Sequence, residues 1–297
     1  KSWKVDLSFN VSRSQNYLRK LSEYAGTESG TWQANGSYLI RNVLNQPYGS
    51  FYGYMYNGVY LNQNQTIAID KKGNPIYTMG QTGEMEPVYM RFNYPSIGYI
   101  FQPGDARYVD VNKDGNINLQ DVVYLGDYNP LFTGGFGPSI RFKNFSLTGW
   151  FHFRYGNDVI NMTRMNMEKM YSFDNQSKAV LKRFRTPFEP GFEDQAPADL
   201  LPRALYAAGY NWLGSDRFVE DGSFLRWKTV TAKYNMPKKL IKGIGLQDLN
   251  LWLTMQNLYT WTNYTGQDPE VSLSSNGRDY SRTPRPYQFT MGLKIGF

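Results

Sequence analysis

The stretch from residue 286 to residue 297 limits most strongly what this chain can fold into. Every second position is apolar or aromatic, with polar residues or glycine between: Tyr287, Phe289, Met291, Leu293, Ile295 and Phe297. An unbroken period of two predicts a β-strand and argues against a helix. Such a two-faced strand suits a soluble sheet with one buried face. It equally suits a barrel wall with lipid on one side and water on the other.

Five further segments of the chain alternate in a similar way. The least regular lies at 224–234, where Leu225 and Trp227 share one phase and Val230 and Ala232 share the other. A β-bulge near Lys228–Thr229 would produce this change of phase. We expect six strands in all, near residues 1–20, 130–142, 144–157, 223–236, 247–263 and 286–297.

Short and long connections alternate between these segments. A tight turn at Lys143-Asn144 joins the second and third, and 235–247 joins the fourth and fifth. The other connections are roughly 110, 65 and 20 residues long, longer than compact soluble domains usually contain. Short turns on one rim and long loops on the other are typical of outer-membrane barrels. The pattern therefore predicts an all-β fold, a transmembrane β-barrel segment with long extracellular loops.

Composition agrees with this fold and excludes several functions. The mean hydropathy is −0.56, and no run of about 18 apolar residues predicts a membrane-spanning helix. A barrel hides its apolar band in alternation, so a low average does not exclude a membrane. The chain has no cysteine and a single histidine, His152. Thiolate metal sites are therefore excluded, and a histidine-rich zinc site or a Ser/His/Asp triad is disfavoured.

The net charge of +7 raises the question of an anionic partner. We interpret it as a scattered surface excess with no nucleic-acid partner, and a basic exterior would also suit anionic lipid head groups. The chain opens on Lys1-Ser-Trp-Lys4, without an initiator methionine or a signal peptide. We therefore expect it to be the C-terminal part of a longer protein.

One long connection carries the spacing of a calcium loop. The proposed ligands are Asp110, Asn112, Asp114, Asn116, Asn118 and Asp121. Gly115 would permit the sharp turn, and Asn116 would offer its carbonyl. Asp121 stands where such loops usually have glutamate, which shortens the reach. Calcium, as a structural ion that stiffens the loop, is the prediction. The alternative is an Asx-rich turn without an ion, its side chains satisfying the local backbone.

Aromatic and cationic side chains supply the candidate substrate contacts. Tyr52, Tyr54 and Tyr56 stand in a tyrosine-rich stretch, and such rings suit sugars or peptide backbones. Trp150, His152, Arg154 and Trp252 are expected on the polar, lumen-facing side of their strands. The alternative for both groups is a packing role. The tyrosines would pack the long loop onto the barrel mouth, and the other four residues would fill the lumen around an internal domain. No nucleophile–base set is apparent, so we predict no catalytic residues and no enzymatic activity.

Several phrases of the chain resemble the SusC-like TonB-dependent transporters of Bacteroidetes outer membranes. In chain order they are residues Gln46–Tyr60, Gly104–Gly115, Leu125–Pro130, Tyr155–Asp158, Phe218–Arg226, Tyr234–Lys239, Gln256–Trp261, Asp268–Glu270 and the final Phe297. Met236 and Trp227 depart from the residues usual in that family.

The resemblance implies the remaining expectations. The barrel would have 22 strands, of which this chain supplies the last six. The plug and the TonB box would lie outside the chain. The function would be TonB-dependent import of an oligosaccharide or peptide across the outer membrane of a Gram-negative bacterium, together with a SusD-like surface lipoprotein. In the family a terminal aromatic such as Phe297 resembles a signal for barrel assembly, although it would also fit an aromatic girdle. The alternative function is that of a secreted calcium-dependent carbohydrate-binding β-protein.

Overall fold

The computed structural model describes residues 3–20, 28–29, 38–41, 43–93, 98–270 and 277–297. The chain divides into two compact units. The first, here called the sheet unit, comprises Lys1–Asn16, Tyr128–Val159 and Glu220–Phe297. The second, the loop unit, comprises Tyr17–Asp127 and Ile160–Val219. The sequence pattern predicts connections for the residues of the loop unit, whereas the structure gives them strands and a core of their own.

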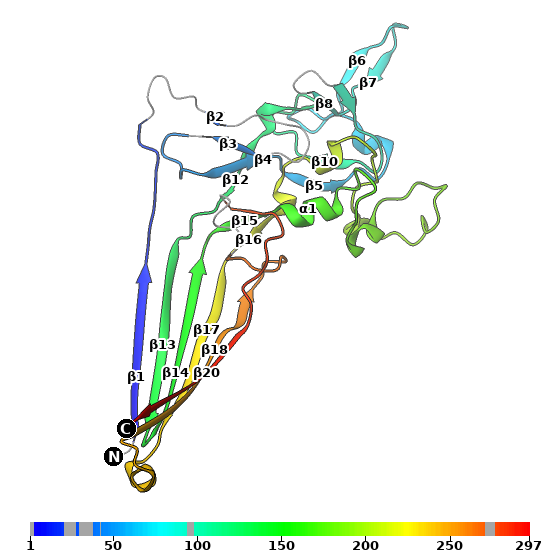
Figure 1. Ribbon diagram of the computed structural model, residues 1–297. Coiled ribbons are helices and arrows are strands. Elements are labelled where there is room, and N and C mark those ends of the chain that lie inside the picture. Colours follow the sequence, from blue (N-terminus) through cyan, green and yellow to red (C-terminus); the bar gives the residue numbers. More distant parts are fainter. Residues whose placement is uncertain (1–2, 21–27, 30–37, 42, 94–97, 271–276) are drawn as a thin grey trace. The chain divides into compact units, whose positions relative to one another are not determined.

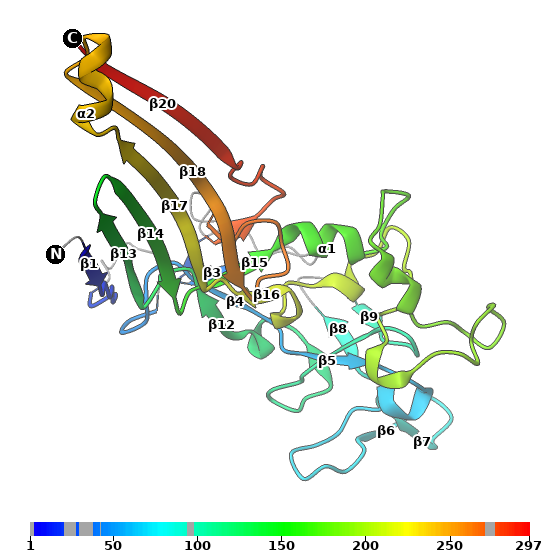
Figure 2. The same ribbon diagram turned by 90° about the horizontal axis from the view of Figure 1, so that it is seen from below.

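A six-stranded antiparallel sheet forms the sheet unit, in the order β1-β13-β14-β17-β18-β20 (Figure 1). Its strands are β1 (Trp3–Ser12), β13 (Phe132–Phe142), β14 (Phe145–Tyr155), β17 (Phe224–Asn235), β18 (Asp248–Thr262) and β20 (Gln288–Gly296). Figure 2 shows that the strands curve together along their length. Because neighbours are antiparallel, both short connections, β13–β14 and β17–β18, lie at one end of the sheet and the three long ones at the other.

The strands fall within the six ranges named from the sequence. The first is shorter than expected, because β1 ends at Ser12, and residues Lys1 and Ser2 lie outside the described part of the chain. The bulge predicted near Lys228–Thr229 is confirmed, since the pairing of β17 with both neighbours shifts between Trp227 and Thr229. This bulge restores a single apolar face along β17 despite the change of phase in its sequence.

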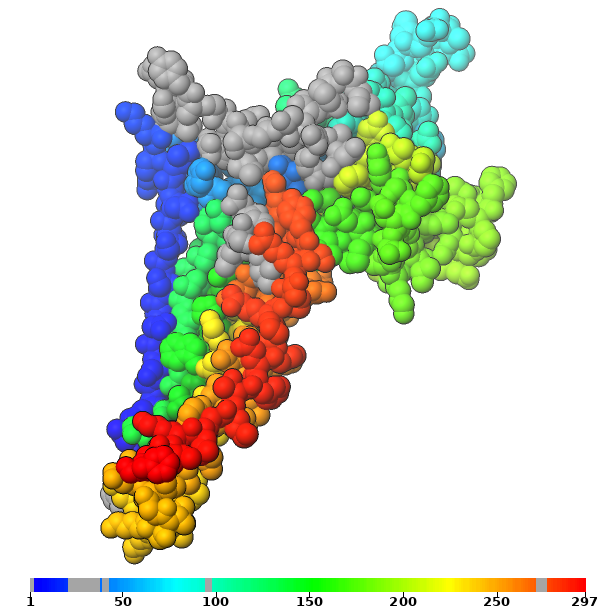
Figure 3. Space-filling model, in the orientation of Figure 1, coloured from blue at the N-terminus to red at the C-terminus, as the bar shows by residue number. Residues whose placement is uncertain are grey.

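The two faces of the sheet differ in chemistry. The apolar face carries large hydrophobic side chains that remain exposed, such as Leu7 and Met291, the latter 85% exposed. β1 and β20 are the edge strands of the sheet, and Figure 3 shows β1, in blue, along one side. Rings stack across this face, with Phe151 between Phe136 (centroids 4.8 Å apart) and Trp227 (5.6 Å). The opposite face, called the polar face below, carries Thr, Ser, Arg and Trp side chains. No helix among the described residues is long and apolar enough to cross a membrane.

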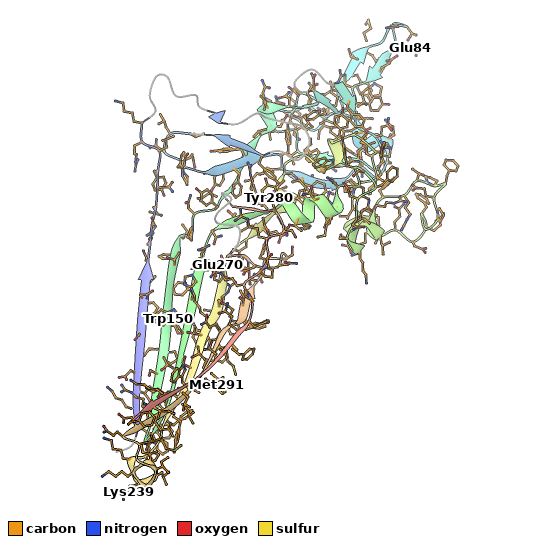
Figure 4. All side chains as sticks on the ribbon, viewed as in Figure 1. Glu84, Trp150, Lys239, Glu270, Tyr280 and Met291 are labelled. Carbon is orange, nitrogen blue, oxygen red and sulfur yellow. The ribbon has the colours of Figure 1, made fainter. Side chains whose placement is uncertain are left out.

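Tryptophan rings on the polar face cover glycines of the neighbouring strand. Trp150 lies about half-way along β14 (Figure 4), and a Cβ added to Gly135 or Gly137 of β13 would meet its ring. Trp252 of β18 is paired directly with Gly292 of β20, where an added Cβ would overlap the indole. The glycines thus leave space for the rings, and the rings cover the glycine backbone where it has no side chain.

Substituting Gly292 tests this packing. Gly292→Ala is expected to destabilise the sheet by about 1–3 kcal/mol, because the indole of Trp252 must leave its position. Gly243→Ala is the matched control, since no atom lies within 4 Å of its added Cβ. Thermal unfolding of the full-length protein in detergent measures both. The double variant Trp252→Leu/Gly292→Ala should recover part of the loss. Equal midpoints for Gly292→Ala and Gly243→Ala would contradict the packing described.

Small elements flank the large sheet. A three-stranded sheet has the order β16-β15-β19, with β15 (Asp158–Asn161), β16 (Val219–Asp221) and β19 (Arg278–Asp279). The β17–β18 connection contains the helix α2 (Lys238–Ile241) and the 3₁₀ turn η7 (Lys242–Ile244). Gly245 ends η7 with a positive φ of 77°, the left-handed conformation that glycine adopts without strain.

The loop unit is built from short strands, one α-helix and 3₁₀ turns. Its four-stranded sheet has the order β12-β4-β3-β2, with β2 (Glu28–Ser29), β3 (Leu39–Arg41), β4 (Ser50–Gly53) and β12 (Val123–Asp127). The other strands are β5 (Tyr56–Val59) with β10 (Ala106–Tyr108), β6 (Tyr77–Met79) with β7 (Met85–Pro87), and β8 (Arg91–Asn93) with β9 (Gly98–Ile100) and β11 (Asn116–Ile117). The helical elements are α1 (Met162–Glu168), η1 (Gln63–Thr66), η2 (Leu119–Asp121), η3 (Lys178–Lys182), η4 (Pro197–Asp199), η5 (Tyr210–Trp212) and η6 (Asp216–Phe218).

An aromatic core holds the loop unit together. Its buried members are Tyr52, Tyr54, Tyr60, Ala68, Met90, Phe92, Phe101, Ala106, Tyr108, Ile117, Val122 and Leu213. Tyr99 stacks on Tyr210 with ring centroids 4.0 Å apart and planes within 8°. Residues far apart in the sequence therefore share one core, which explains why alternation within a single segment does not reveal it.

Candidate functional site

The polar face of the sheet brings together the predicted lumen-facing residues. His152 is paired with Arg226 and Arg154 with Phe224, so these side chains share one face. Trp150 and Trp252 lie on that same face, where they cover glycines as described above. The ring of His152 packs 5.7 Å from that of Phe224. Both tryptophans pack against glycines of the neighbouring strand, and their contact with a substrate stays a prediction.

A buried ion network occupies the loop end of the polar face. Arg226, only 3% exposed, donates to Asp268, to Glu270 at 2.7 Å and to the Thr260 hydroxyl at 2.9 Å. Arg285 adds an ion pair with Glu270 at 3.1 Å. Glu270 lies near the loop end of β17 (Figure 4). The network fixes the β18–β20 connection to the sheet. No local pattern in the sequence predicts this pairing, although Asp268 and Glu270 belong to a phrase of the family resemblance.

Arg154 stands beside this network with unused donors. It is buried, with a relative exposure of 9%. Its Nε and Nη1 atoms have no hydrogen-bond partner in the described part of the chain, and its guanidinium lies 5.6 Å from the centroid of the Phe224 ring. Of the four predicted lumen-facing residues, Arg154 alone has buried side-chain donors without a partner among the described residues. It is therefore the strongest candidate among them for a contact with an anionic or hydroxyl group.

The three tyrosines predicted to contact substrate are placed differently. Tyr54 is 0% exposed and Tyr52 is also buried, so both belong to the core of the loop unit. Tyr56 is partly buried, and the Arg217 guanidinium lies 5.2 Å from its ring centroid. The substrate-binding prediction is corrected for Tyr52 and Tyr54, because buried rings offer no surface to a substrate. Their rings pack in the core of the loop unit itself.

Backbone amides surround the side chains of the predicted calcium loop. Asp110 accepts hydrogen bonds from the amides of Lys113 (2.7 Å), Asp114 (3.3 Å) and Gly115 (2.8 Å). Asp121 accepts from Val111 and Asn118 at 2.8 and 2.9 Å. Burial raises the pKa of the Asp121 carboxyl above its ordinary value. Gly115 has a φ of 81°, which provides the sharp turn expected of it.

These contacts fit a calcium ion only in part. A carboxylate has about four lone-pair sites, so one that accepts two amides retains capacity for a cation. However, no three His, Cys, Asp or Glu side chains within the described ranges are grouped as metal ligands. Asn112 instead donates to Asp114 at 3.0 Å and to Gln120 at 2.6 Å. The loop satisfies its own backbone in this structure, and calcium stays a prediction.

A second buried carboxylate organises the loop unit and was not singled out from the sequence. Asp105, 0% exposed, accepts from Arg203 Nε (2.7 Å), the Tyr99 hydroxyl (2.6 Å) and Asn211 Nδ2 (3.2 Å). Burial and the bond to Asp105 raise the pKa of the Tyr99 hydroxyl. Tyr99, Asp105 and Arg203 lie in separate parts of the sequence, so only the folded chain reveals their association.

Comparison with known proteins shows which receptors the chain resembles. No family model matches the chain. It is 29% identical to TonB-dependent receptor P3 of Formosa agariphila over 98% of its length and 26% of that receptor's. It is 23% identical to TonB-dependent receptor SusC of Bacteroides thetaiotaomicron, over 100% of its own length and 25% of the length of SusC. The chain is similar to TonB-dependent receptors, SusC among them. It spans about a quarter of their length.

Solved structures of the RagAB peptide transporter agree with this relationship. One matches all of the chain and 28% of its own chain, with a TM-score of 0.68 and 20% identity. Another, of the importer in its open-open state, gives a TM-score of 0.66 and 21% identity. At this identity the likeness concerns the fold. The fold class predicted from the sequence, an all-β segment of a transmembrane β-barrel, is confirmed.

Phe297 directly follows β20 on the apolar phase of that strand. Its side chain is exposed. An interfacial girdle residue and an assembly signal would both present this side chain on the apolar face. Its role in assembly therefore stays a prediction.

Proposed function

We propose that the chain forms barrel wall and extracellular loops of an outer-membrane transporter that imports an oligosaccharide or peptide with energy from TonB. The observation that carries the proposal is the two-faced sheet. One face is apolar and exposed, and the other holds buried charge. An apolar surface that continues across every strand of a sheet requires a non-aqueous covering. The relationship to TonB-dependent receptors supports the same function.

We further propose a SusD-like surface lipoprotein as the partner. The support is the resemblance to SusC-like proteins and the likeness in fold to the RagAB peptide transporter. The relatives bear receptor and transporter names, which agrees with a role outside catalysis.

Growth measurements test the proposed function. A strain lacking the gene is expected to lose growth on one substrate from a panel of glycans and peptides, and to recover it on complementation. The full-length protein should sediment with the outer membrane and require detergent for extraction. Release into the medium as a soluble protein would instead favour the secreted calcium-dependent carbohydrate-binding alternative. Normal growth of the deletion strain on the whole panel would argue against import.

We also propose that the loop from Asp110 to Asp121 binds calcium and is stiffened by it. The spacing of its oxygen-bearing side chains and the turn at Gly115 support this. Asp110→Ala or Asp114→Ala is expected to weaken calcium binding at least about tenfold while the barrel stays folded, since the loop contributes no strand to the large sheet. Asp70→Ala, in another turn of the loop unit, is the control. Calorimetry with metal analysis measures binding. If wild-type protein supplied with millimolar calcium contains none, the proposal is wrong and the loop is an Asx-rich turn without an ion.

A further inference from the structure

A pocket of about 260 Å³ opens in the loop unit beside the predicted calcium loop. Residues of the two-stranded sheet β5–β10 line it, and so do Tyr60 and Tyr108, which are almost completely buried. Its remaining walls are Asn57, Asn64, Gln65, Ile67, Ile69, Met90, Arg107, Val109, Asp110 and Lys113. A space of this size holds one sugar residue or one amino-acid side chain. All of its walls belong to one compact unit and to described residues.

The alternation of side chains along β10 explains why the side chain of Arg107 lines this pocket. Ala106 and Tyr108 are buried in the core, so Arg107 between them stands on the other face of β10. Arg107 and Lys113 are both partly buried. In the described part of the chain, neither side chain forms a hydrogen bond or an ion pair. Partly desolvated cations without a partner are costly, and an anion placed between them would relieve that cost.

The one acidic residue in the pocket does not cancel this charge. Asp110 is buried, and both of its carboxylate oxygens already accept backbone amides of the following turn. Arg107 and Lys113 therefore leave an excess of one positive charge in the lining. Asn57 and Asn64 add amide groups that no hydrogen bond within the described residues uses. The lining thus offers several donors, and the rings of Tyr60 and Tyr108 lie too deep to stack on a sugar.

We propose that this pocket binds an anionic group of the transported substrate, a carboxylate or sulfate, with Arg107 and Lys113 as its cationic contacts. The proposal rests on the proposed import function and names a substrate class for it. An acidic saccharide and an acidic peptide share this chemistry. A guanidinium forms paired hydrogen bonds with a carboxylate or sulfate, whereas an ammonium acts as a point charge.

Equilibrium binding to the full-length protein in detergent tests the proposal. The probes are tetragalacturonate and a neutral tetrasaccharide, and a peptide with one glutamate and its glutamine twin, both amidated. The acidic member of one pair is expected to bind about tenfold more tightly, with an advantage that shrinks as salt rises. The pair that shows the preference identifies the source of the anion.

Substitutions then assign the preference to the pocket. Arg107→Gln and Lys113→Gln should each remove most of it, whereas Arg107→Lys should keep part. Lys71→Gln, on an exposed turn of the same unit, is the control for net charge. Acidic probes that bind no better than their neutral twins, or a preference that survives Arg107→Gln, would overturn the proposal. Binding requires no transport, so an acidic preference without uptake would count against import alone.

Discussion

Replacing Arg226 with leucine is expected to destabilise the sheet unit by about 3–5 kcal/mol, because a buried ion network loses its central cation. Asp268 would remain buried and Glu270 partly buried, both without the Arg226 guanidinium that now donates to them. The segment between β18 and β20 should detach from the polar face. Thermal unfolding in detergent measures the loss, and hydrogen exchange across residues 263–287 locates it.

Arg141→Leu provides the matched control for Arg226. Arg141 also extends from a strand of the large sheet, but its ion pair with Asp6 at 2.9 Å is solvent-exposed on both sides. Exposed pairs contribute little, so this variant should unfold close to wild type. If both arginine variants shift the midpoint equally, the buried network does not hold the connection in place.

Asp105→Ala is expected to have an effect of similar size in the loop unit, again about 3–5 kcal/mol. The substitution leaves Arg203 and the Tyr99 hydroxyl without their shared acceptor inside the aromatic core. The stacked pair of Tyr99 and Tyr210 should loosen with it. Limited proteolysis should then cut within 43–93 or 98–127 at protease concentrations that leave the wild type intact.

Asp199→Ala tests whether loss of any aspartate in this unit would do the same. Its pair with Lys182, 3.2 Å long, is largely exposed, and its removal should leave the proteolysis pattern unchanged. Cleavage of Asp199→Ala at the same rate as Asp105→Ala would show that the buried cluster has no special part in the fold.

The six strands were predictable because their signal is local. Alternation of period two is written into each segment, and even the change of phase between Trp227 and Val230 indicated the bulge. The loop unit was not predictable in this way. Tyrosine suits a core and a binding surface equally well. Tyr54 lies in the core because it packs in one cluster with distant residues such as Leu213, which the sequence alone does not show.

The same limit applies to the candidate sites. Asp105 meets Arg203, and Arg226 meets Glu270, across long stretches of sequence. No spacing rule connects such partners. The pocket at Arg107 also depends on where Lys113 lies after folding. The predicted calcium loop differs, because its spacing is local and visible in the sequence. Whether it binds calcium depends on whether its oxygen atoms lie close enough together to coordinate one ion.

Uptake of a labelled substrate into cells tests the central claim, that this chain belongs to an energised importer, most directly. The substrate is the glycan or peptide on which the deletion strain fails to grow. Cells with the intact protein are expected to accumulate label, and the deletion strain and cells with disabled TonB should not. Accumulation that continues at the wild-type rate without TonB, or without this protein, would contradict the claim.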